Sequence, residues 1–347
     1  MTQTALLDGV LEFARRLAAA LLVWPVLAAA GPQYQAREIQ DPQGRTLYAG
    51  AINADGLVAG RTNAKRFVGS AQAFVASRHG YEQEAILASR YSFAAGINVA
   101  GDVVGNHGAK PGFVQAFIRR HDESAIDLFD VDHTFSSGAN AINHAGVVVG
   151  NVQPAGTDQP QAFAWHDGQV TLLGGLGGAY GNAHAINDAG TIVGTASIAG
   201  GLLRAFRYEN GQMTMLSSIT AQDPGDVAYA ISSIGVAAGS CAVRNSRRHA
   251  CVWQGDEVID LGTLSGGSSE AFGINGAGVL VGRADNGTGG KAAFVYRGGQ
   301  MRDLNAITEL PTGVYLDVAI AINDQGQILA HGKGPNMRHS FVLEPIR

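Results

Sequence analysis

Lysine and arginine gather in seven short stretches that recur along the chain. The stretches hold twelve basic residues against two acidic ones, Asp158 and Asp285, and cover residues 61–72, 106–115, 151–161, 195–204, 240–249, 283–292 and 331–339. The whole chain, in contrast, has a formal net charge of −5 at pH 7. Because a guanidinium group holds a carboxylate or phosphate through two hydrogen bonds, these cations favour an anionic partner.

Most of these cations fall in the first, fifth, sixth and seventh stretches. We expect ten of them to form a basic arc that binds the partner: Arg61, Lys65, Arg66, Arg244, Arg247, Arg248, Arg283, Lys291, Lys333 and Arg338. Few aromatic residues are interleaved for base stacking, so an acidic polysaccharide or acidic protein surface is favoured over nucleic acid. Acidic residues in neighbouring connections dilute the arc. The alternative is that these cations only keep the surface solvated.

A second, smaller polar set occupies one position of a repeated apolar segment. Asn140, His184 and Tyr229 stand there in consecutive copies. The other copies have Gly50, Ala95, Phe272 and Ile320 at this position. If the position lines a central channel, the three polar residues form a small site. Ordinary packing, with the polar groups bonded to the backbone, is the alternative.

Known catalytic and ligand-binding motifs are missing from the sequence. It has no Gly-x-Ser-x-Gly, His-Glu-x-x-His, phosphate loop, dinucleotide fingerprint or calcium loop. The carboxylates beside the repeated turns, Asp55, Asp102, Asp188 and Asp324, come one to a turn, too few for a hard cation. We expect them to be solvated, and we expect no metal, no cofactor and no catalytic residues.

The segments that must position these residues repeat with a period near 45. The repeat core is Ile-Asn-x-x-Gly, and successive closing glycines are 45, 45, 44, 45, 43 and 48 residues apart. Those glycines are Gly56, Gly101, Gly146, Gly190, Gly235, Gly278 and Gly326. In the fifth copy Ser232 takes the place of Asn. A fixed period of this length indicates a repeat architecture.

Each repeat predicts four short antiparallel strands, a, b, c and d. Asn favours the first position and Gly the fourth position of the turn between a and b. Asn210-Gly211, Asp167-Gly168 and Gly298-Gly299 favour two-residue turns between c and d, where both residues need a positive φ. The basic stretches are then the connections between b and c.

Small residues in strand a predict how the repeats assemble. Ala precedes the Ile by three residues in all seven copies, and Ala or Gly precedes it by one. Since side chains alternate along a strand, we expect both positions on one face, where innermost strands converge. A parallel solenoid would need large aliphatic residues there. The prediction is an all-β, seven-bladed β-propeller with four antiparallel strands per blade.

The two ends of the repeat array predict how the ring closes. The chain finishes in a c-type strand, and residues 35–39 resemble a d strand. We therefore expect the N-terminal strand to complete the last blade, which hides the open edge of the ring. Residues 31–347 hold seven units with little left over, so we expect a single domain and a monomer.

Residues 1–30 differ from the rest of the chain. Arg15-Arg16 precede an apolar run of eleven residues, 17–27, and then Ala28-Ala29-Ala30. The run is too short to cross a bilayer. It predicts a signal peptide cleaved after Ala30 and a secreted or periplasmic protein without a transmembrane segment. The leader before the apolar run is long, which a true start further downstream would explain. The alternative to a signal peptide is a disordered or helical N-terminal extension.

The two cysteines, Cys241 and Cys251, flank the b–c connection of the fifth repeat. If that connection is a hairpin, paired positions across it lie within disulfide range. The alternative is two small buried residues, since Cys251 stands where other repeats have Phe.

Two stretches carry a family resemblance. Residues 161–178 (QAFAWHDGQVTLLGGLGG) and 249–267 (HACVWQGDEVIDLGTLSGG), with the Ile-Asn-x-x-Gly cores, resemble the HAF repeat family of extracellular bacterial proteins. Several copies depart from the pattern, including Cys251 in place of Phe. The resemblance implies an exported repeat protein and supplies no catalytic residues.

The sequence thus predicts an exported binding module for an anionic partner. The alternative is an extracellular lyase or hydrolase that acts on an acidic polysaccharide with the same rim. A cluster of His, Tyr and a carboxylate at the axis would favour the enzyme, because the fold itself hosts both classes.

Overall fold

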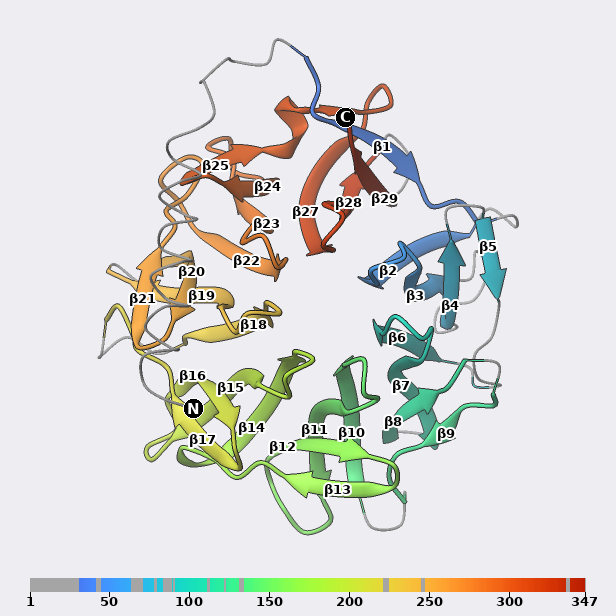
Figure 1. Cartoon of the computed structure of the whole chain (residues 1–347), viewed down its shortest axis with the longest axis vertical. Coiled ribbons are helices and arrows are strands. Elements are labelled where there is room, and N and C mark those ends of the chain that lie inside the picture. The colour runs from blue at the N-terminus through green and yellow to red at the C-terminus, as the bar shows by residue number, and fades with distance from the viewer. Residues whose placement is uncertain are drawn as a thin grey trace.

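The computed structural model describes residues 31–346 except 42–44, 64–70, 78–79, 84–88, 90, 111–112, 122, 131–133, 221–224, 245–246 and 335–337. Seven antiparallel sheets stand in a ring around a central axis (Figure 1). The predicted seven-bladed β-propeller is therefore confirmed. The predicted signal peptide, residues 1–30, lies outside the described residues. No helix in the described part of the chain is long and apolar enough to cross a membrane.

Blades 1 to 6 each consist of four consecutive strands, innermost strand first. Blade 1 has β2 (Thr46–Ile52), β3 (Val58–Asn63), β4 (Ala71–Ser77) and β5 (Gly80–Gln83); blade 2 has β6 (Ser92–Ile97), β7 (Val103–Lys110), β8 (Phe113–Arg119) and β9 (Ile126–Asp127). Blade 3 has β10 (Thr134–Ile142), β11 (Val148–Pro154), β12 (Gln161–His166) and β13 (Gln169–Leu172); blade 4 has β14 (Gly177–Ile186), β15 (Ile192–Ile198), β16 (Leu203–Glu209) and β17 (Gln212–Met215). Blade 5 has β18 (Val227–Ile231), β19 (Ala237–Val243), β20 (Arg247–Gln254) and β21 (Glu257–Asp260); blade 6 has β22 (Ser269–Ile274), β23 (Leu280–Asp285), β24 (Lys291–Arg297) and β25 (Gln300–Asp303).

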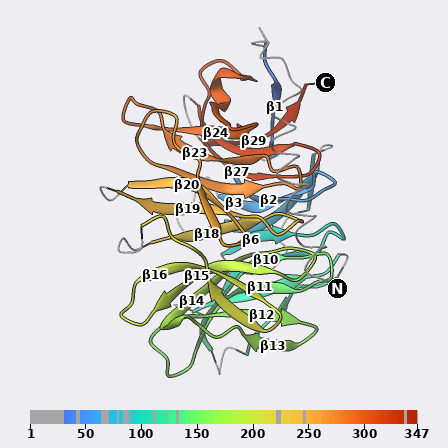
Figure 2. The same ribbon diagram turned by 60° about the vertical axis from the view of Figure 1, so that its left-hand side comes forward.

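Blade 7 is built from both ends of the array. It contains β27 (Tyr315–Ile322), β28 (Ile328–Lys333), β29 (Arg338–Pro345), β1 (Tyr34–Glu38) and β26 (Thr308–Glu309). β1 pairs antiparallel with β29 along its whole length, and Figure 2 shows the two strands side by side. Ring closure by the N-terminal strand is confirmed, one residue earlier than predicted. The parallel pairing of β26 with the outer edge of β1 was not foreseen.

The core lies between neighbouring blades. Strand c of six blades contributes a Phe with no exposed surface: Phe74, Phe117, Phe163, Phe206, Phe294 and Phe341. Burying a side chain of this size contributes about 2–3 kcal/mol to folding. The predicted two-residue turns between strands c and d also form, since Asp167 and Asn210 have the positive φ that such turns require, 46° and 53°. They are the only non-glycine residues with positive φ in the described ranges.

One expectation about strand a was wrong. Ala49 packs in the cluster shared with blade 7, whereas Ala51 packs in the cluster shared with blade 2, so the two lie on opposite faces. The cause is a register shift between them, which leaves Gly50 as an extra residue in the strand. All seven inner strands carry this shift at the same place. Such a bulge re-aims the extra residue, which here is the variable position of the repeat.

The turn asparagines have a second role that the sequence did not reveal. In six repeats the Asn side-chain oxygen accepts the backbone N–H four residues on, as in Asn53 with Leu57 at 2.9 Å. Its side-chain amide also donates to the backbone carbonyl of the corresponding turn residue in the next blade. Six such bonds of 2.9–3.2 Å link the blades around the axis, from Asn53, Asn98, Asn143, Asn187, Asn275 and Asn323.

Ser232 interrupts this ring of bonds. Its hydroxyl accepts the N–H of Val236 at 3.0 Å, so the turn is kept. A serine hydroxyl is shorter than the Asn amide, and Ser232 makes no bond to the turn of blade 6 within the described residues. The junction between blades 5 and 6 therefore has one inter-blade hydrogen bond fewer.

The two cysteines form a disulfide, with their Cα atoms 5.9 Å apart. They are not directly opposite, since Cys241 pairs with His249 and Cys251 pairs with Gly239. Both cysteines are fully buried, and Cys251 stands at the strand c position that holds a Phe in the other blades. The bond closes the b–c hairpin of blade 5, which carries Arg244, Arg247 and Arg248.

Candidate functional site

The bulged position of strand a places a run of side chains around the axis. The amide of Asn140 donates to the side-chain oxygen of Asn182 and to the carbonyl of Ala183 in the next blade, both at 2.7 Å. The rings of His184 and Tyr229 lie 5.7 Å apart, centre to centre. The ring of Phe272 follows at 5.1 Å from Tyr229. The structure thus brings His184 and Tyr229 together, while Asn140 bonds to Asn182 and Ala183 of the same inner strand as His184.

His184 and Tyr229 are both uncharged at neutral pH. Burial lowers the pKa of His184 to about 4, and the Thr195 hydroxyl lies 3.3 Å from its Nε2 atom. Burial raises the pKa of Tyr229, and the charge of Glu270 raises it further, while Arg248 acts in the opposite direction. A neutral imidazole that can accept a proton therefore stands beside a phenol that can donate one.

Arginine occupies equivalent repeat positions in blades 1 and 6, with different surroundings. Arg283 donates from Nε to Glu270 at 2.6 Å, and its guanidinium lies 5.4 Å from the Phe272 ring centre. Arg61 lies over the rings of Tyr48 and Phe93, at 5.2 and 5.9 Å. Tyr48 is the repeat counterpart of Glu270, each standing opposite its arginine across strands a and b. Arg61 has no carboxylate partner within the described part of the chain.

Carboxylates neutralise the remaining cations of the basic arc in blades 6 and 7. Lys291 lies 2.5 Å from Asp285. Arg338 donates to both oxygens of Asp317 at 2.6 and 2.7 Å, and Lys333 lies 3.7 Å from the same carboxylate. Acidic residues were expected to weaken the positive charge of the arc, and in blades 6 and 7 they do so by direct ion pairs. Lys65 and Arg66 lie outside the described residues.

The blade 5 hairpin keeps three arginines without an ion pair among the described residues. Arg244 is exposed at the tip. Arg247 donates to the carbonyl of Gly266 at 2.6 Å. Arg248 donates to the Ser240 hydroxyl at 3.0 Å and to the carbonyl of Gly225. With Arg61, these are the described positions of the arc where a guanidinium forms no ion pair.

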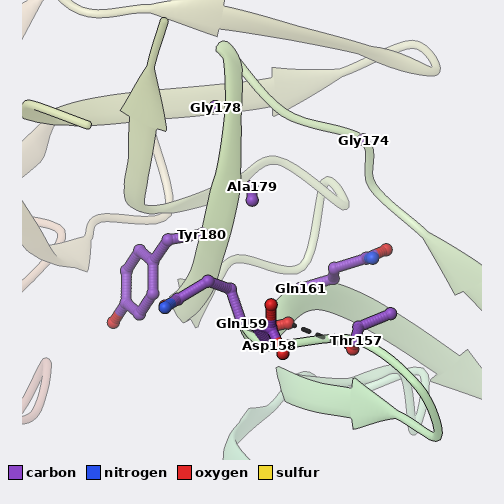
Figure 3. Close-up of a pocket in the computed structure, with 8 residues that line it drawn as sticks. All are labelled: Thr157, Asp158, Gln159, Gln161, Gly174, Gly178, Ala179 and Tyr180. Carbon is purple, nitrogen blue, oxygen red and sulfur yellow. Dashed lines mark hydrogen bonds between the residues drawn. The ribbon is translucent and has the colours of Figure 1, made fainter. Parts of the chain in front are cut away.

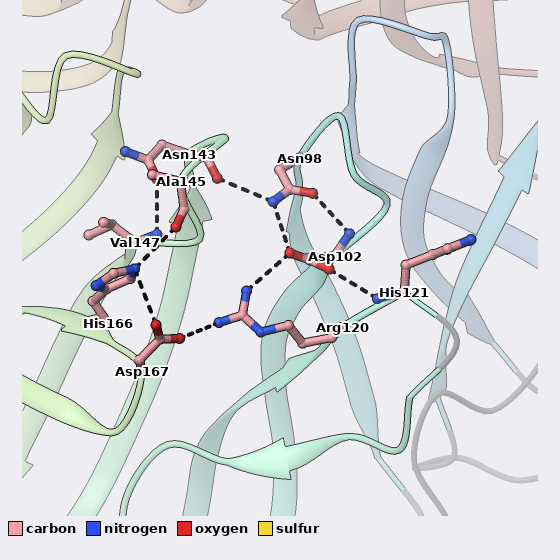
Figure 4. Close-up of polar contacts among 9 residues, drawn as sticks. All are labelled: Asn98, Asp102, Arg120, His121, Asn143, Ala145, Val147, His166 and Asp167. Atoms are coloured by element: carbon pink, nitrogen blue, oxygen red, sulfur yellow. Dashed lines mark hydrogen bonds and ion pairs between the residues drawn. The ribbon is translucent and has the colours of Figure 1, made fainter.

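The opposite rim, formed by the a–b and c–d turns, carries a closed polar network between blades 2 and 3 (Figure 4). Arg120 bridges Asp102 at 3.3 Å and Asp167 at 2.7 Å. Asp102 also accepts the backbone N–H of His121 at 3.0 Å and the Asn98 amide at 3.1 Å. Asp102 is only 7% exposed, so the expectation of a solvated turn carboxylate was wrong for this residue. Its donors are all internal, which makes the network a brace between blades.

A groove of about 380 Å³ lies between blades 3 and 4 on the b–c rim (Figure 3). One wall comes from the b–c connection of blade 3, with Asp158 and Gln159. The other comes from Gly174 and from the first residues of β14, with Gly178 and Tyr180. Sequence reasoning missed this groove because two connections that are distant in their repeats build it together. In the described residues, no group of three or more His, Cys, Asp or Glu side chains could hold a metal ion.

Comparison with known proteins supports the fold and no more. No protein-family model matches the chain, and no curated protein is significantly similar to it. The resemblance to the HAF repeat family therefore stays a prediction.

Among solved structures, the chain is similar to the β-propeller domain of the Trilobed protease from Pyrococcus furiosus. The TM-score is 0.57 at 9% identity, over 86% of this chain and 93% of that one. That domain is described as having an open velcro topology, whereas β1 closes the last blade here.

Two larger proteins are also similar. A prolyl endopeptidase gives a TM-score of 0.57 at 13% identity, over 85% of this chain and 48% of its own. TolB from Acinetobacter baumannii gives 0.50 at 13% identity, over 84% and 65%. This chain thus spans about half of the length of the prolyl endopeptidase and just under two thirds of that of TolB. Identities this low show the propeller fold alone.

Proposed function

We propose that this protein is an exported, monomeric binding module of the HAF repeat type that recognises an acidic polysaccharide. The observation that carries the proposal is the blade 5 hairpin. Its three arginines, Arg244, Arg247 and Arg248, form no ion pair among the described residues, while the cations of blades 6 and 7 are paired. Arg247 lies near Asp285, and its charge adds to that of Lys291 in lowering the pKa of this carboxyl. A polysaccharide is favoured over an acidic protein surface because Arg61 offers a second, separate guanidinium in blade 1. An elongated polyanion can reach both.

Export rests on residues 1–30 and on the disulfide. Disulfides persist in oxidising compartments outside the cytoplasm. Fractionation followed by intact-mass measurement should find the protein outside the cytoplasm, beginning near Gly31. Cytoplasmic protein that retains Met1 would overturn this part of the proposal.

Binding is tested with polygalacturonate at increasing salt. Exposed charges are screened over about 10 Å at 0.1 M salt, so affinity should fall as salt rises. The triple change Arg244→Ala, Arg247→Ala and Arg248→Ala should weaken binding at least tenfold while the melting temperature stays close to the parent. Arg302→Ala, an exposed arginine on the outer strand β25, is the matched control and should bind normally.

Two results would count against the polysaccharide. An affinity that changes neither with salt nor with the triple substitution would mean that the hairpin arginines are solvated and do not contact the ligand. Binding of an acidic protein but of no carboxylated polysaccharide would show that the partner is an acidic protein surface.

The second candidate function is a polysaccharide lyase, and the contact between His184 and Tyr229 favours it. In such a reaction the neutral His184 imidazole would take the proton from the carbon next to the uronate carboxylate. Tyr229 would give its proton to the departing glycosidic oxygen, and Arg248 would hold the carboxylate. Formation of unsaturated uronate products, abolished by His184→Ala, would establish the lyase. Binding of polygalacturonate without any turnover would establish the module.

A further inference from the structure

The groove between blades 3 and 4 presents polar side chains without protein partners. Asp158 and Gln159 are exposed, and Gln161 at the start of β12 is half-buried. Within the described residues, none of these three side chains makes a hydrogen bond or ion pair. Each can therefore give its carboxylate or amide to a ligand without breaking an existing bond.

The floor and one wall of the groove are held in place by the backbone. A side chain at Gly178 would bring its Cβ within 2.2 Å of the Ser197 hydroxyl, so glycine is required there. The same hydroxyl accepts the backbone N–H of Tyr180 at 3.0 Å. Ser197 thus fixes the segment that carries the Tyr180 ring, which Figure 3 shows beside the Gln159 side chain. The result is a preformed slot lined by Tyr180 and, at Gly174 and Gly178, by backbone without side chains.

These features together match the chemistry of a sugar ring. Planar amide and carboxylate groups can each bond two adjacent hydroxyls, and an aromatic ring covers the C–H face of a pyranose. The groove volume of about 380 Å³ falls at the small end of the range for ligand sites. Asp158 is the one charged residue among those lining it, and no cation lies there. An acidic sugar would be repelled by that carboxylate.

We propose that this groove binds a neutral pyranose, a single sugar or one unit of an oligosaccharide. The site is independent of the basic arc, which lies on blades 5, 6, 7 and 1. Sugar binding in the groove can therefore be tested independently of acidic-polysaccharide binding by the arc.

The test uses the full chain and three neutral disaccharides, cellobiose, lactose and maltose, in saturation-transfer NMR and calorimetry. We expect at least one to bind with a dissociation constant on the order of 1 mM. Tyr180→Ala should weaken that binding at least tenfold, while Tyr180→Phe, which keeps the ring, should retain most of it. Gln169→Ala, an exposed glutamine on the outer strand β13, is the matched control and should bind as the parent does.

Charge is tested with glucose and glucuronate, and location is tested with the same disaccharides. Glucuronate should bind more weakly than glucose in the parent, and Asp158→Asn should reduce that preference. The triple arginine change of blade 5 should leave disaccharide binding unchanged. The proposal is overturned if no neutral disaccharide binds, if Tyr180→Ala binds normally, or if glucuronate binds as well as glucose.

Discussion

The two halves of the ring share one skeleton and line the axis with different chemistry. The cationic half consists of blades 5, 6, 7 and 1, and the amide half consists of blades 2, 3 and 4. In the cationic half arginines lie on aromatic rings, as Arg61 does on Tyr48. In the amide half, Asn140 and Asn151 both donate to the side-chain oxygen of Asn182, at 2.7 and 3.1 Å.

The difference shows where this fold tolerates variation. The buried alanines, the strand c phenylalanines and the turn asparagines are nearly constant from blade to blade. The variable chemistry lies at a few positions of strands a and b and in the connections between strands b and c. One substitution there decides whether a cation is available, since Glu270 neutralises Arg283 while Tyr48 leaves Arg61 unpaired.

The largest effect should come from breaking the skeleton that both halves share. Deleting residues 31–40 removes β1 and exposes the edges of β29 and β26. The change also loses the buried side chains of Tyr34 and Ile39, 6% and 7% exposed, which contribute together about 4 kcal/mol. We expect the melting temperature in calorimetry to fall by several degrees, with binding at both halves weakened. An unchanged melting temperature would contradict ring closure by β1.

The next effect concerns His184, at the junction of the two halves. Its pKa is about 4 in the folded protein and 6.5 in the unfolded chain, so the unfolded chain binds the proton first as pH falls. Stability from the neutral imidazole is present above pH 6.5 and is lost between pH 6.5 and 4, by at most about 3 kcal/mol. His184→Gln should therefore melt close to the parent at pH 7 and above it at pH 4.

The parent protein is the control for the pH dependence of the His184→Gln variant. Every other titrating group is common to both, including His331, whose pKa is also lowered by burial. Melting curves that change in parallel with pH would show that His184 is not held neutral by the fold.

A reciprocal exchange tests the difference between Arg61 and Arg283 directly. Tyr48→Glu should pair Arg61 as Glu270 pairs Arg283, and polygalacturonate affinity should fall about tenfold, or about 1.4 kcal/mol. Glu270→Tyr should free Arg283 and raise the affinity by a smaller factor, because aromatic contacts remain. Equal affinities in both variants would mean that neither arginine touches the polyanion.

The smallest effect tests the one turn that departs from the skeleton. Ser232→Asn should add the missing inter-blade bond to the carbonyl of Asn275 and raise stability by about 1 kcal/mol. Asn143→Ser should remove the bond to Asn187 and lower stability by a similar amount. Thermal melting of the two variants measures both changes. A destabilised Ser232→Asn would show that the space between blades 5 and 6 cannot hold the longer side chain.

The sequence predicted what depends on local spacing. The period of Ile-Asn-x-x-Gly determines seven blades, and Asn210-Gly211 determines a hairpin turn because of its φ requirement. Strict alternation failed at Ala49 and Ala51 because a bulge adds Gly50 between them, and no residue type signals that bulge. The pairing of Arg283 with Glu270 depends on register across two strands, so a count of loop charges could not reveal it.

The position of β1 has a consequence for how the protein folds after synthesis. Tyr34 pairs with Thr308 and with Pro345, so the first strand of the ring to be synthesised finds its neighbours last. Contacts separated by such a length of chain are slow to form, because a large loop must close before they give any stability. Blades 1 to 6 can each fold from consecutive residues, but the last cannot. Only a chain synthesised as far as β29 can therefore close the ring. A chain interrupted earlier keeps an unpaired first strand and stays sensitive to proteolysis.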